Sequence, residues 1–567
     1  MIPGYPQLQV TQRHICQQIY LYNLLTMPKY LLPSSAWLRF LVVTVLALGL
    51  FFRFANLERK FYWYDETFTS LRISGYTEDE VAKQVFTGQE ISVSSLQKFQ
   101  NPNPEKGLID AIKGMAKEDP HIPPLYFILL RLWTDLFGGS IISTRSFSAV
   151  ISLLALPCIY WLCQELFKSP LVGWIATLLI AVSPFHLLYA QEARMYSLWT
   201  VTTLLSSAAL LQAIRLKKRI GWVIYTITLT LGLYTYLFTL LTALGHGIYV
   251  FVIERFRLTK TLLSYLIASI AGLILFLPWI SNIFLGTSEI DKRLAWANTK
   301  PDLLSLIKAW PFQPSRLFFD VGVGGQSSGL SILLASPIAI ILLALVVYSI
   351  YYLCTKAPRN TWVFVLTLII VLPLFLIFRD VFKGGKISTI MRYLIPGYLG
   401  MQIAVAYFLS SKITDVSISN IRRQFWQSVT TVLLLSGIIS CVLVTQAVSW
   451  WHTGEGNYKF FQVAQIINQS EQPLVISSGS IHTEKSVVGS VLSLSHLLDS
   501  TVKLQLTVEP EVPNVSSDSN NIFLYQPPAS LVRNLEQKYE IKPATNEKLG
   551  TKKDKIFLWR LSLPNKK

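Results

Sequence analysis

The stretch PLVGWIATLLIAVSPFHLLY, residues 170–189, indicates the class of fold because it carries no charged side chain. A helix needs about 20 apolar residues to cross the ~30 Å hydrocarbon core of a bilayer. Similar runs lie at 37–54, 143–166, 196–214, 220–238, 239–253, 260–280, 331–354, 361–378, 393–410 and 426–447. The sequence therefore predicts an all-α polytopic membrane protein with about eleven transmembrane helices. For the adjoining runs 220–238 and 239–253, a single broken span is the alternative to two short spans.

The composition agrees with a membrane protein. Of the 567 residues, 52% are hydrophobic and 14% are charged, whereas soluble domains have about 25% charged residues. The net charge of +18 is concentrated in short links between apolar runs, as on the cytoplasmic side of membrane proteins. These links are 215–219, 255–260, 356–359 and 422–423. The pattern argues against an ordinary cytosolic enzyme and against a nucleic-acid partner.

The same charge rule places residues 1–36 in the cytoplasm and residues 448–567 outside. Residues 37–447 then form the transmembrane domain, with external loops at 55–144 and 281–330. In the tail, 473–477, 521–525 and 555–559 have the composition of buried strands, while 457–470 and 531–539 have helical spacing. We therefore expect a small external, periplasmic α/β domain after the last span.

The stretch 123–138 is short and polar for a span. It begins with Pro123 and Pro124 and contains Arg131 and Asp135. We expect an interfacial or partly re-entrant helix. A short additional span is the alternative.

An acidic pair follows the first span in FYWYDETF, residues 61–68. Asp65 and Glu66 stand there beside Trp63 and Tyr64. Partial desolvation at a membrane surface raises the pKa of a carboxyl group and makes it a better proton acceptor. We therefore expect a catalytic carboxylate in this segment, and a solvated turn is the alternative.

Further ionisable side chains stand near the external ends of later spans. Arg145 opens the second span, where a guanidinium needs an anionic partner. The turn after residues 170–189 carries Glu192 and Arg194, and their pairing with each other is the structural alternative. Lys386 and Arg392 add cations on the external face, which favours an anion held at the membrane surface.

Aromatic and histidine side chains near these charges complete the candidate site. The residues expected to bind substrate are Trp63, Tyr64, His121, His186, Tyr196 and Tyr393. A ligand with a phosphate group and a lipid tail would match these carboxylates, cations and aromatic side chains. Its tail enters the bilayer, the cations hold the phosphate as a leaving group, and a carboxylate takes a proton from the nucleophile.

The order of these motifs resembles the GT-C superfamily of membrane glycosyltransferases. The acidic pair, the His121 element before Pro123-Pro124, Arg145-Ser-Phe, Glu192-Ala-Arg194 and Arg392-Tyr-Leu-Ile-Pro396 follow one another as in that superfamily. The similarity covers about the first 450 residues. It is strongest to the branch of protein O-mannosyltransferases, lipid A aminoarabinose transferases and their uncharacterised bacterial relatives. The residue inserted between His121 and the prolines departs from the family pattern, and the tail does not resemble a β-trefoil.

This resemblance implies a polyprenyl-phosphate-linked sugar as donor and inversion at the anomeric carbon. Asp65 matches the catalytic aspartate, Glu66 its neighbour, Arg145 the arginine that opens the next span, and Glu192 with Arg194 the acid–arginine turn. Arg392, with Arg145 or Arg194, and Lys386 would bind the donor phosphate, and Glu192 is a further catalytic candidate. No cofactor is required, although a divalent metal is compatible with the acids present.

The predicted function is transfer of a sugar to an acceptor hydroxyl on the external face of the inner membrane, with Asp65 as general base. The acceptor is a protein, a lipid or a polysaccharide. A polymerase or ligase of surface polysaccharide with a lipid diphosphate donor is one alternative. A transporter or flippase is the other. The prediction requires Asp65 and the Glu192–Arg194 turn to meet at one lipid-accessible cavity.

Overall fold

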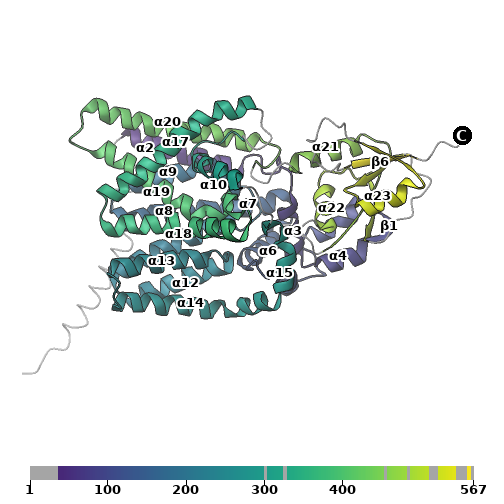
Figure 1. Ribbon diagram of the computed structural model, residues 1–567, viewed down its shortest axis with the longest axis horizontal. Coiled ribbons are helices and arrows are strands. Elements are labelled where there is room, and N and C mark those ends of the chain that lie inside the picture. The colour runs from purple at the N-terminus through teal and green to yellow at the C-terminus, as the bar shows by residue number, and fades with distance from the viewer. Residues whose placement is uncertain are drawn as a thin grey trace, which may run out of the picture.

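A bundle of long helices and a smaller region with a β-sheet make up the protein (Figure 1). The computed structural model describes residues 36–298, 303–322, 329–451, 456–481, 486–509, 521–544 and 558–562. The bundle contains α2 (Ala36–Phe54), α7 (Ile141–Leu153), α8 (Ala155–Phe167), α9 (Pro170–Ala181), α10 (Pro184–Ala190), α11 (Tyr196–Leu216), α12 (Arg219–Thr235), α13 (Thr239–Ile253), α14 (Lys260–Leu285), α17 (Gly329–Lys356), α18 (Arg359–Lys383), α19 (Ile395–Thr414) and α20 (Asn420–Gln446).

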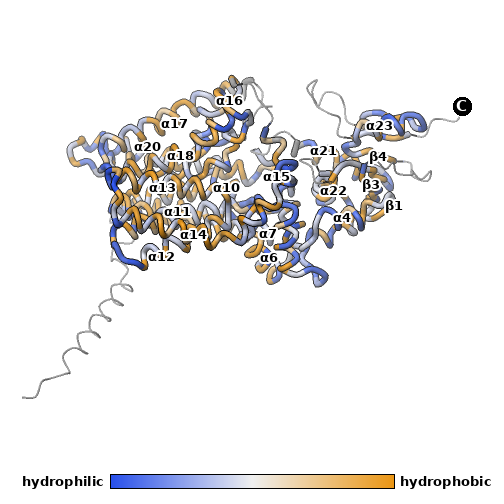
Figure 2. The backbone as a smooth tube through the Cα atoms, turned by 60° about the horizontal axis from the view of Figure 1, so that its bottom comes forward, coloured by the Kyte–Doolittle hydropathy of each residue, from blue (hydrophilic) through white to orange (hydrophobic). Residues whose placement is uncertain are grey.

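The apolar runs of the sequence lie on these helices. Run 143–166 is divided between α7 and α8, and run 170–189 between α9 and α10. Among the described residues, seven helices are long and apolar enough to cross a membrane, or eight if the bent pair α9 and α10 forms one span. Figure 2 shows an apolar middle of the bundle between hydrophilic ends. The outer face of α14 exposes Ile267, Ile270 and Ile274, each more than half exposed, as expected of side chains solvated by lipid.

The sheet has the order β1-β3-β2-β4-β6-β5. Its strands are β1 (Thr87–Ser92), β2 (Leu474–Gly479), β3 (Lys503–Val508), β4 (Ile522–Tyr525), β5 (Glu540–Pro543) and β6 (Leu558–Ser562). The central strands β3, β2 and β4 are parallel and the outer pairs are antiparallel. The strands expected at 473–477 and 521–525 correspond to β2 and β4. Of the strand expected at 555–559, residues 555–557 lie outside the described residues and 558–559 begin β6. In contrast, β1 comes from the first loop, more than 400 residues before its partner β3.

Helices cover both faces of this sheet. They are α21 (Gly456–Asn468), α22 (Val487–Ser495) and α23 (Ala529–Glu536). Because alternate residues of a strand point to opposite faces, Leu474 and Ile476 pack with Leu531 and Leu535 of α23, whereas Val475 joins the larger core with α21 and α22.

Short helices lie between the bundle and the sheet region. In the first loop they are α3 (Tyr64–Ser74), α4 (Glu78–Val85), α5 (Leu108–Glu118) and α6 (Leu125–Phe137); in the second they include α15 (Thr287–Arg293) and α16 (Leu303–Ala309). Figure 1 places α3, α6 and α15 at this boundary. The helix expected within 123–138 is thus present as α6.

The pairing of β1 with β3 limits how often the chain can cross a membrane. Both strands must lie on the same side of the membrane, so the number of crossings between them is even. The seven long apolar helices, which all lie between β1 and β3, therefore cannot be the complete set of crossings.

Thr226 and Tyr234 of α12 donate to the carbonyls of Ala268 and Leu275 of α14, at 3.1 and 3.0 Å, so these two helices are parallel. The intervening α13 therefore runs antiparallel to both, and 220–253 forms a hairpin. The ten predicted spans after α2 give an even number of crossings between β1 and β3 only if α6 does not cross. The total of eleven spans stays a prediction.

The break between α9 and α10 directs the chain toward the first loop. The two helices are bent by 60° at Ser183-Pro184, where proline cannot supply a helical N–H. The buried Arg53 side chain donates to the Ala181 carbonyl at 2.8 Å and to the Ile180 carbonyl at 3.3 Å. It thereby supplies a donor to the Ala181 carbonyl at the break and a second donor to the Ile180 carbonyl, which also accepts from the Ser183 N–H at 3.4 Å.

Replacing Arg53 by methionine should destabilise the protein. The change leaves the Ala181 carbonyl without the guanidinium that donates to it at 2.8 Å, and a buried unsatisfied polar group costs about 1–3 kcal/mol. The thermal midpoint in detergent should fall relative to Arg219→Met, which removes a cation from the exposed start of α12. Equal midpoints for the two variants would show that Arg53 does not support the break.

Candidate active site

A cavity of about 1360 Å³ lies where the short helices meet the bundle. Its wall takes residues from α3, from the turns before α11 and α13, from α17 and from the segment before α19. Nine of the predicted site residues line it: Trp63, Tyr64, Asp65, His121, Arg194, Tyr196, Lys386, Arg392 and Tyr393. Glu66, Arg145, His186 and Glu192 are not on the cavity wall.

Asp65 lies in the first turn of α3 and faces two arginines. Its Oδ2 atom is 3.6 Å from Nη1 of Arg392 and 4.0 Å from Nε of Arg194. The side chain of Asp65 is 24% exposed, so it is open to the cavity. The N-terminal turn of a helix also favours a negative charge. Asp65 is therefore an accessible carboxylate in a cationic setting.

Aromatic rings hold the guanidinium of Arg392. Its central carbon lies 5.5 Å from the ring centre of Trp63, 5.6 Å from that of Tyr196 and 5.4 Å from that of Tyr393. Such contacts stabilise a cation most where water is excluded. Arg194 is held by α3, because its Nη1 donates to the Asp65 carbonyl and to Thr69 Oγ1, both at 3.3 Å.

Glu66 is the anionic partner expected for Arg145. The guanidinium donates to both carboxylate oxygens, at 2.8 and 2.6 Å, and both side chains are fully buried. Arg145 also donates to the carbonyls of Leu57, Lys60 and Phe61. The same carboxylate accepts from the Ala193 backbone N–H at 2.9 Å. The pair therefore ties α3 to the turn that carries Arg194, and it lies behind the cavity wall.

His186 and Glu192 lie in the buried region next to that turn. His186 is hydrogen-bonded to Gln402 of α19 at 2.9 Å. Glu192 is fully buried and interacts electrostatically with Arg194 and Arg392. These two residues support the wall from behind.

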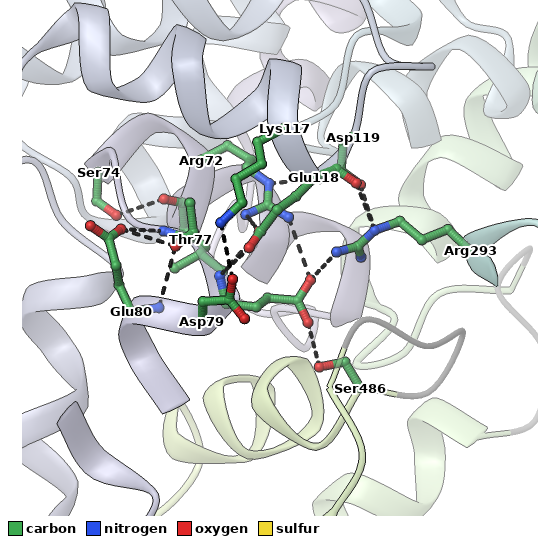
Figure 3. Close-up of polar contacts among 12 residues, drawn as sticks. Arg72, Ser74, Thr77, Asp79, Glu80, Lys117, Glu118, Asp119, Arg293 and Ser486 are labelled. Carbon is green, nitrogen blue, oxygen red and sulfur yellow. Dashed lines mark hydrogen bonds and ion pairs between the residues drawn. The ribbon is translucent and has the colours of Figure 1, made fainter. Parts of the chain in front are cut away.

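A second charged cluster forms another part of the cavity wall (Figure 3). Arg72 is 2.6 Å from a carboxylate oxygen of Glu118 and 2.6 Å from one of Asp119. Arg293 of α15 is 3.2 Å from Asp119 and also pairs with Glu78. Sequence reasoning missed this cluster. The available signal was Arg72, seven residues after Asp65 and so on the same face of α3.

The histidine of the first loop borders this cluster. Burial lowers the pKa of His121 to about 4, although Asp119 acts in the opposite direction. The imidazole is therefore neutral at pH 7. Its Nδ1 atom is buried and makes no hydrogen bond within the described part of the chain.

The stability of the protein should depend on His121 in mildly acidic solution. The ordinary histidine pKa is 6.5 and that of His121 in the folded state is about 4. Between these values the unfolded chain binds a proton that the folded chain does not, so stability falls as the pH is lowered from 6.5 to 4. The thermal midpoint of His121→Gln should fall less over this range than that of the wild type. Parallel pH profiles would contradict the assignment.

Two further cations of the cavity come from the second loop. Lys308 and Arg316 line the wall together with Lys386, and both lysines are exposed. No residue of 281–330 was among the candidates, although that loop was expected on the external face. Among the described residues, no group of three or more His, Cys, Asp or Glu is arranged to hold a metal ion.

The chain resembles known proteins in one segment of its sequence and in its fold. Residues 121–281 match the model of the dolichyl-phosphate-mannose-protein mannosyltransferase family, a segment that contains His121, Arg145, Glu192 and Arg194. No curated protein matches the chain. The structure of ArnT from Cupriavidus metallidurans bound to undecaprenyl phosphate is similar, with a TM-score of 0.50 at 11% identity over 93% of this chain and 98% of that one. The apo Archaeoglobus fulgidus oligosaccharyltransferase gives 0.49 at 12% identity over 90% and 70%.

Residues 121–281 thus resemble the dolichyl-phosphate-mannose-protein mannosyltransferase family, and the fold of the chain is similar to that of ArnT. The resemblance inferred from its motifs is confirmed, and the fold it shares with ArnT extends over almost the whole of both chains.

Proposed function

We propose that the protein transfers a sugar from a polyprenyl-phosphate donor to an acceptor hydroxyl by an inverting single displacement. The observation that carries this proposal is the Asp65 carboxylate, exposed to a cavity of about 1360 Å³ with Arg392 at 3.6 Å. A similar solved structure, that of ArnT, contains undecaprenyl phosphate, which supports a lipid phosphate as the leaving group.

In the proposed reaction Asp65 accepts the proton of the acceptor hydroxyl. The hydroxyl oxygen attacks the anomeric carbon, the bond from that carbon to the phosphate oxygen breaks, and the lipid phosphate leaves with the electron pair. Lys308, Arg316 and Lys386 are available on the cavity wall to bind the phosphate. Arg392 and Arg194 keep Asp65 in place and stabilise charge at the reacting centre.

We place this reaction on the external face of the inner membrane. The four basic links join α11 to α12, α13 to α14, α17 to α18 and α19 to α20. Because α20 ends near the sheet region, these links lie at the opposite end of the bundle. The positive-inside rule then puts the links and the N-terminus in the cytoplasm, and the cavity with residues 448–567 outside.

The test is a reconstitution with defined donors. Protein in lipid nanodiscs is incubated with polyprenyl-phosphate sugars or polyprenyl-diphosphate sugars and an extract of cell-envelope acceptors, and the released lipid is identified by mass spectrometry. We expect release of the lipid monophosphate together with glycosylated acceptor. Release of the diphosphate would favour the polymerase or ligase alternative, and movement of intact donor between leaflets would favour a flippase.

A further inference from the structure

The helices and strands that follow α20, from α21 to β6, are called the C-terminal domain below. This domain contacts the helix that carries Asp65. Its helix α22 packs against α3 with all residues from Val487 to Leu494 buried. Tyr64, the first residue of α3 and the neighbour of Asp65, accepts a hydrogen bond at its hydroxyl from the Ser486 backbone N–H at 3.0 Å. Further along α3, Thr67 and Ser493 are hydrogen-bonded through their hydroxyls at 2.9 Å. The first turns of α3 are thus held from the side opposite the bundle.

Gly489 is the point of closest approach between these helices. A Cβ atom at this position would lie 2.6 Å from Cε2 of Tyr64 and closer still to the ring of Phe68. Tyr64 and Phe68 line the cavity together with Asp65, and their rings pack against each other with centres 4.8 Å apart. Only a residue without a side chain allows this approach. Gly489 therefore determines how closely the rings of Tyr64 and Phe68 pack against α22.

A side-chain contact links α22 to the second charged cluster. Ser486 Oγ donates to Oε2 of Glu78 at 2.5 Å, and the other carboxylate oxygen of Glu78 meets Arg293 and lies 3.5 Å from Arg72 of α3. Figure 3 shows Ser486 converging on this cluster with Arg72 and Arg293. The domain therefore holds α3 near both of its ends.

We infer that α22 positions the Asp65 carboxylate in the cavity, and that Gly489 is a positioning residue for sugar transfer. This inference rests on the proposed function. Gly489 touches no substrate; it acts through Tyr64 and Phe68, whose rings must move if it gains a side chain. The C-terminal domain then belongs to the catalytic apparatus, in addition to any part it takes in recognising the acceptor.

The experiment compares Gly489→Ala with Gly114→Ala in α5, where an added Cβ would make an ordinary contact with Thr77 at 3.6 Å. Misplacing a reacting group by about 1 Å can lower the rate ~10²-fold. We expect kcat of Gly489→Ala to fall about 10- to 100-fold while KM for the donor stays within about twofold and Gly114→Ala keeps wild-type values. Amide hydrogen exchange of residues 64–74 should be faster in Gly489→Ala than in the control.

Several results would overturn the inference. Equal kcat and equal exchange in the two variants would show that α22 does not position α3. A parallel fall in kcat and in the folded fraction would reduce Gly489 to a packing residue. If Gly489→Ala does not fold, Ser486→Ala takes its place. A lower kcat and faster amide hydrogen exchange of residues 64–74 are then expected for Ser486→Ala. If the wild type and Gly114→Ala both release no lipid phosphate, the proposed function has failed, and the exchange measurement still decides whether α22 restrains α3.

Discussion

Replacing Asp65 by asparagine should lower kcat by about 10²- to 10⁴-fold, the usual contribution of a general base. Asparagine keeps the size of the side chain and an oxygen that can accept from Arg392, but it cannot take a proton. The fold should be unaffected because this side chain is 24% exposed and its nearest cation is 3.6 Å away. Release of lipid phosphate, measured with saturating donor, checks the prediction.

The matched control is Asp79→Asn. Asp79 belongs to the same loop and pairs at 3.0 Å with Lys117, and it is not among the residues that line the cavity. Its turnover should equal that of the wild type. If Asp65→Asn turned over as fast as Asp79→Asn, Asp65 would not be the base and the proposed mechanism would be wrong.

Replacing Arg145 by methionine should destabilise the protein by about 3–5 kcal/mol, because it leaves the carboxylate of Glu66 buried without its counter-charge. The carbonyls of Leu57, Lys60 and Phe61 lose a donor as well. Unfolding in detergent, followed by denaturant titration, measures the effect. Arg145→Lys should recover only part of the stability, since an ammonium group cannot reproduce the two parallel hydrogen bonds.

An ion pair at the other end of the bundle supplies the control. Arg215 and Glu165 are 2.7 Å apart, but the side chain of Arg215 is 47% exposed. Exposed pairs contribute about 0–1 kcal/mol, so Arg215→Met should have a small effect. A loss in Arg145→Met no larger than in Arg215→Met would contradict the role of the buried pair.

The sequence was sufficient for the parts of the fold that depend on local pattern. Uninterrupted apolar runs identified the bundle helices, and the cost of an unpaired guanidinium at membrane depth predicted a partner for Arg145. Local pattern alone could not assign the two members of the acidic pair, and only the resemblance to the GT-C glycosyltransferases favoured Asp65 as the base. Adjacent residues of an α-helix point about 100° apart, so only one carboxylate faces the cavity, and which one depends on how α3 is rotated against its neighbours.

Contacts between distant segments were the other part that the sequence did not reveal. The strand β1 has the sequence TGQEIS, in which Ile91 is the one large apolar side chain. It has no apolar strand pattern, and it becomes a strand through its pairing with β3. Arg293 and Lys308 belong to a loop whose position relative to α3 depends on the packing of the whole bundle. No periodicity or spacing carries that information.

The pairing of Thr87 with Thr507 also sets an order of events during biosynthesis. A ribosome releases the loop with Asp65 long before it makes β3 and α22, so this loop cannot complete its pairing until β3 has been made and lies on the same side of the membrane. A chain terminated early would insert its helices and still lack a finished active centre.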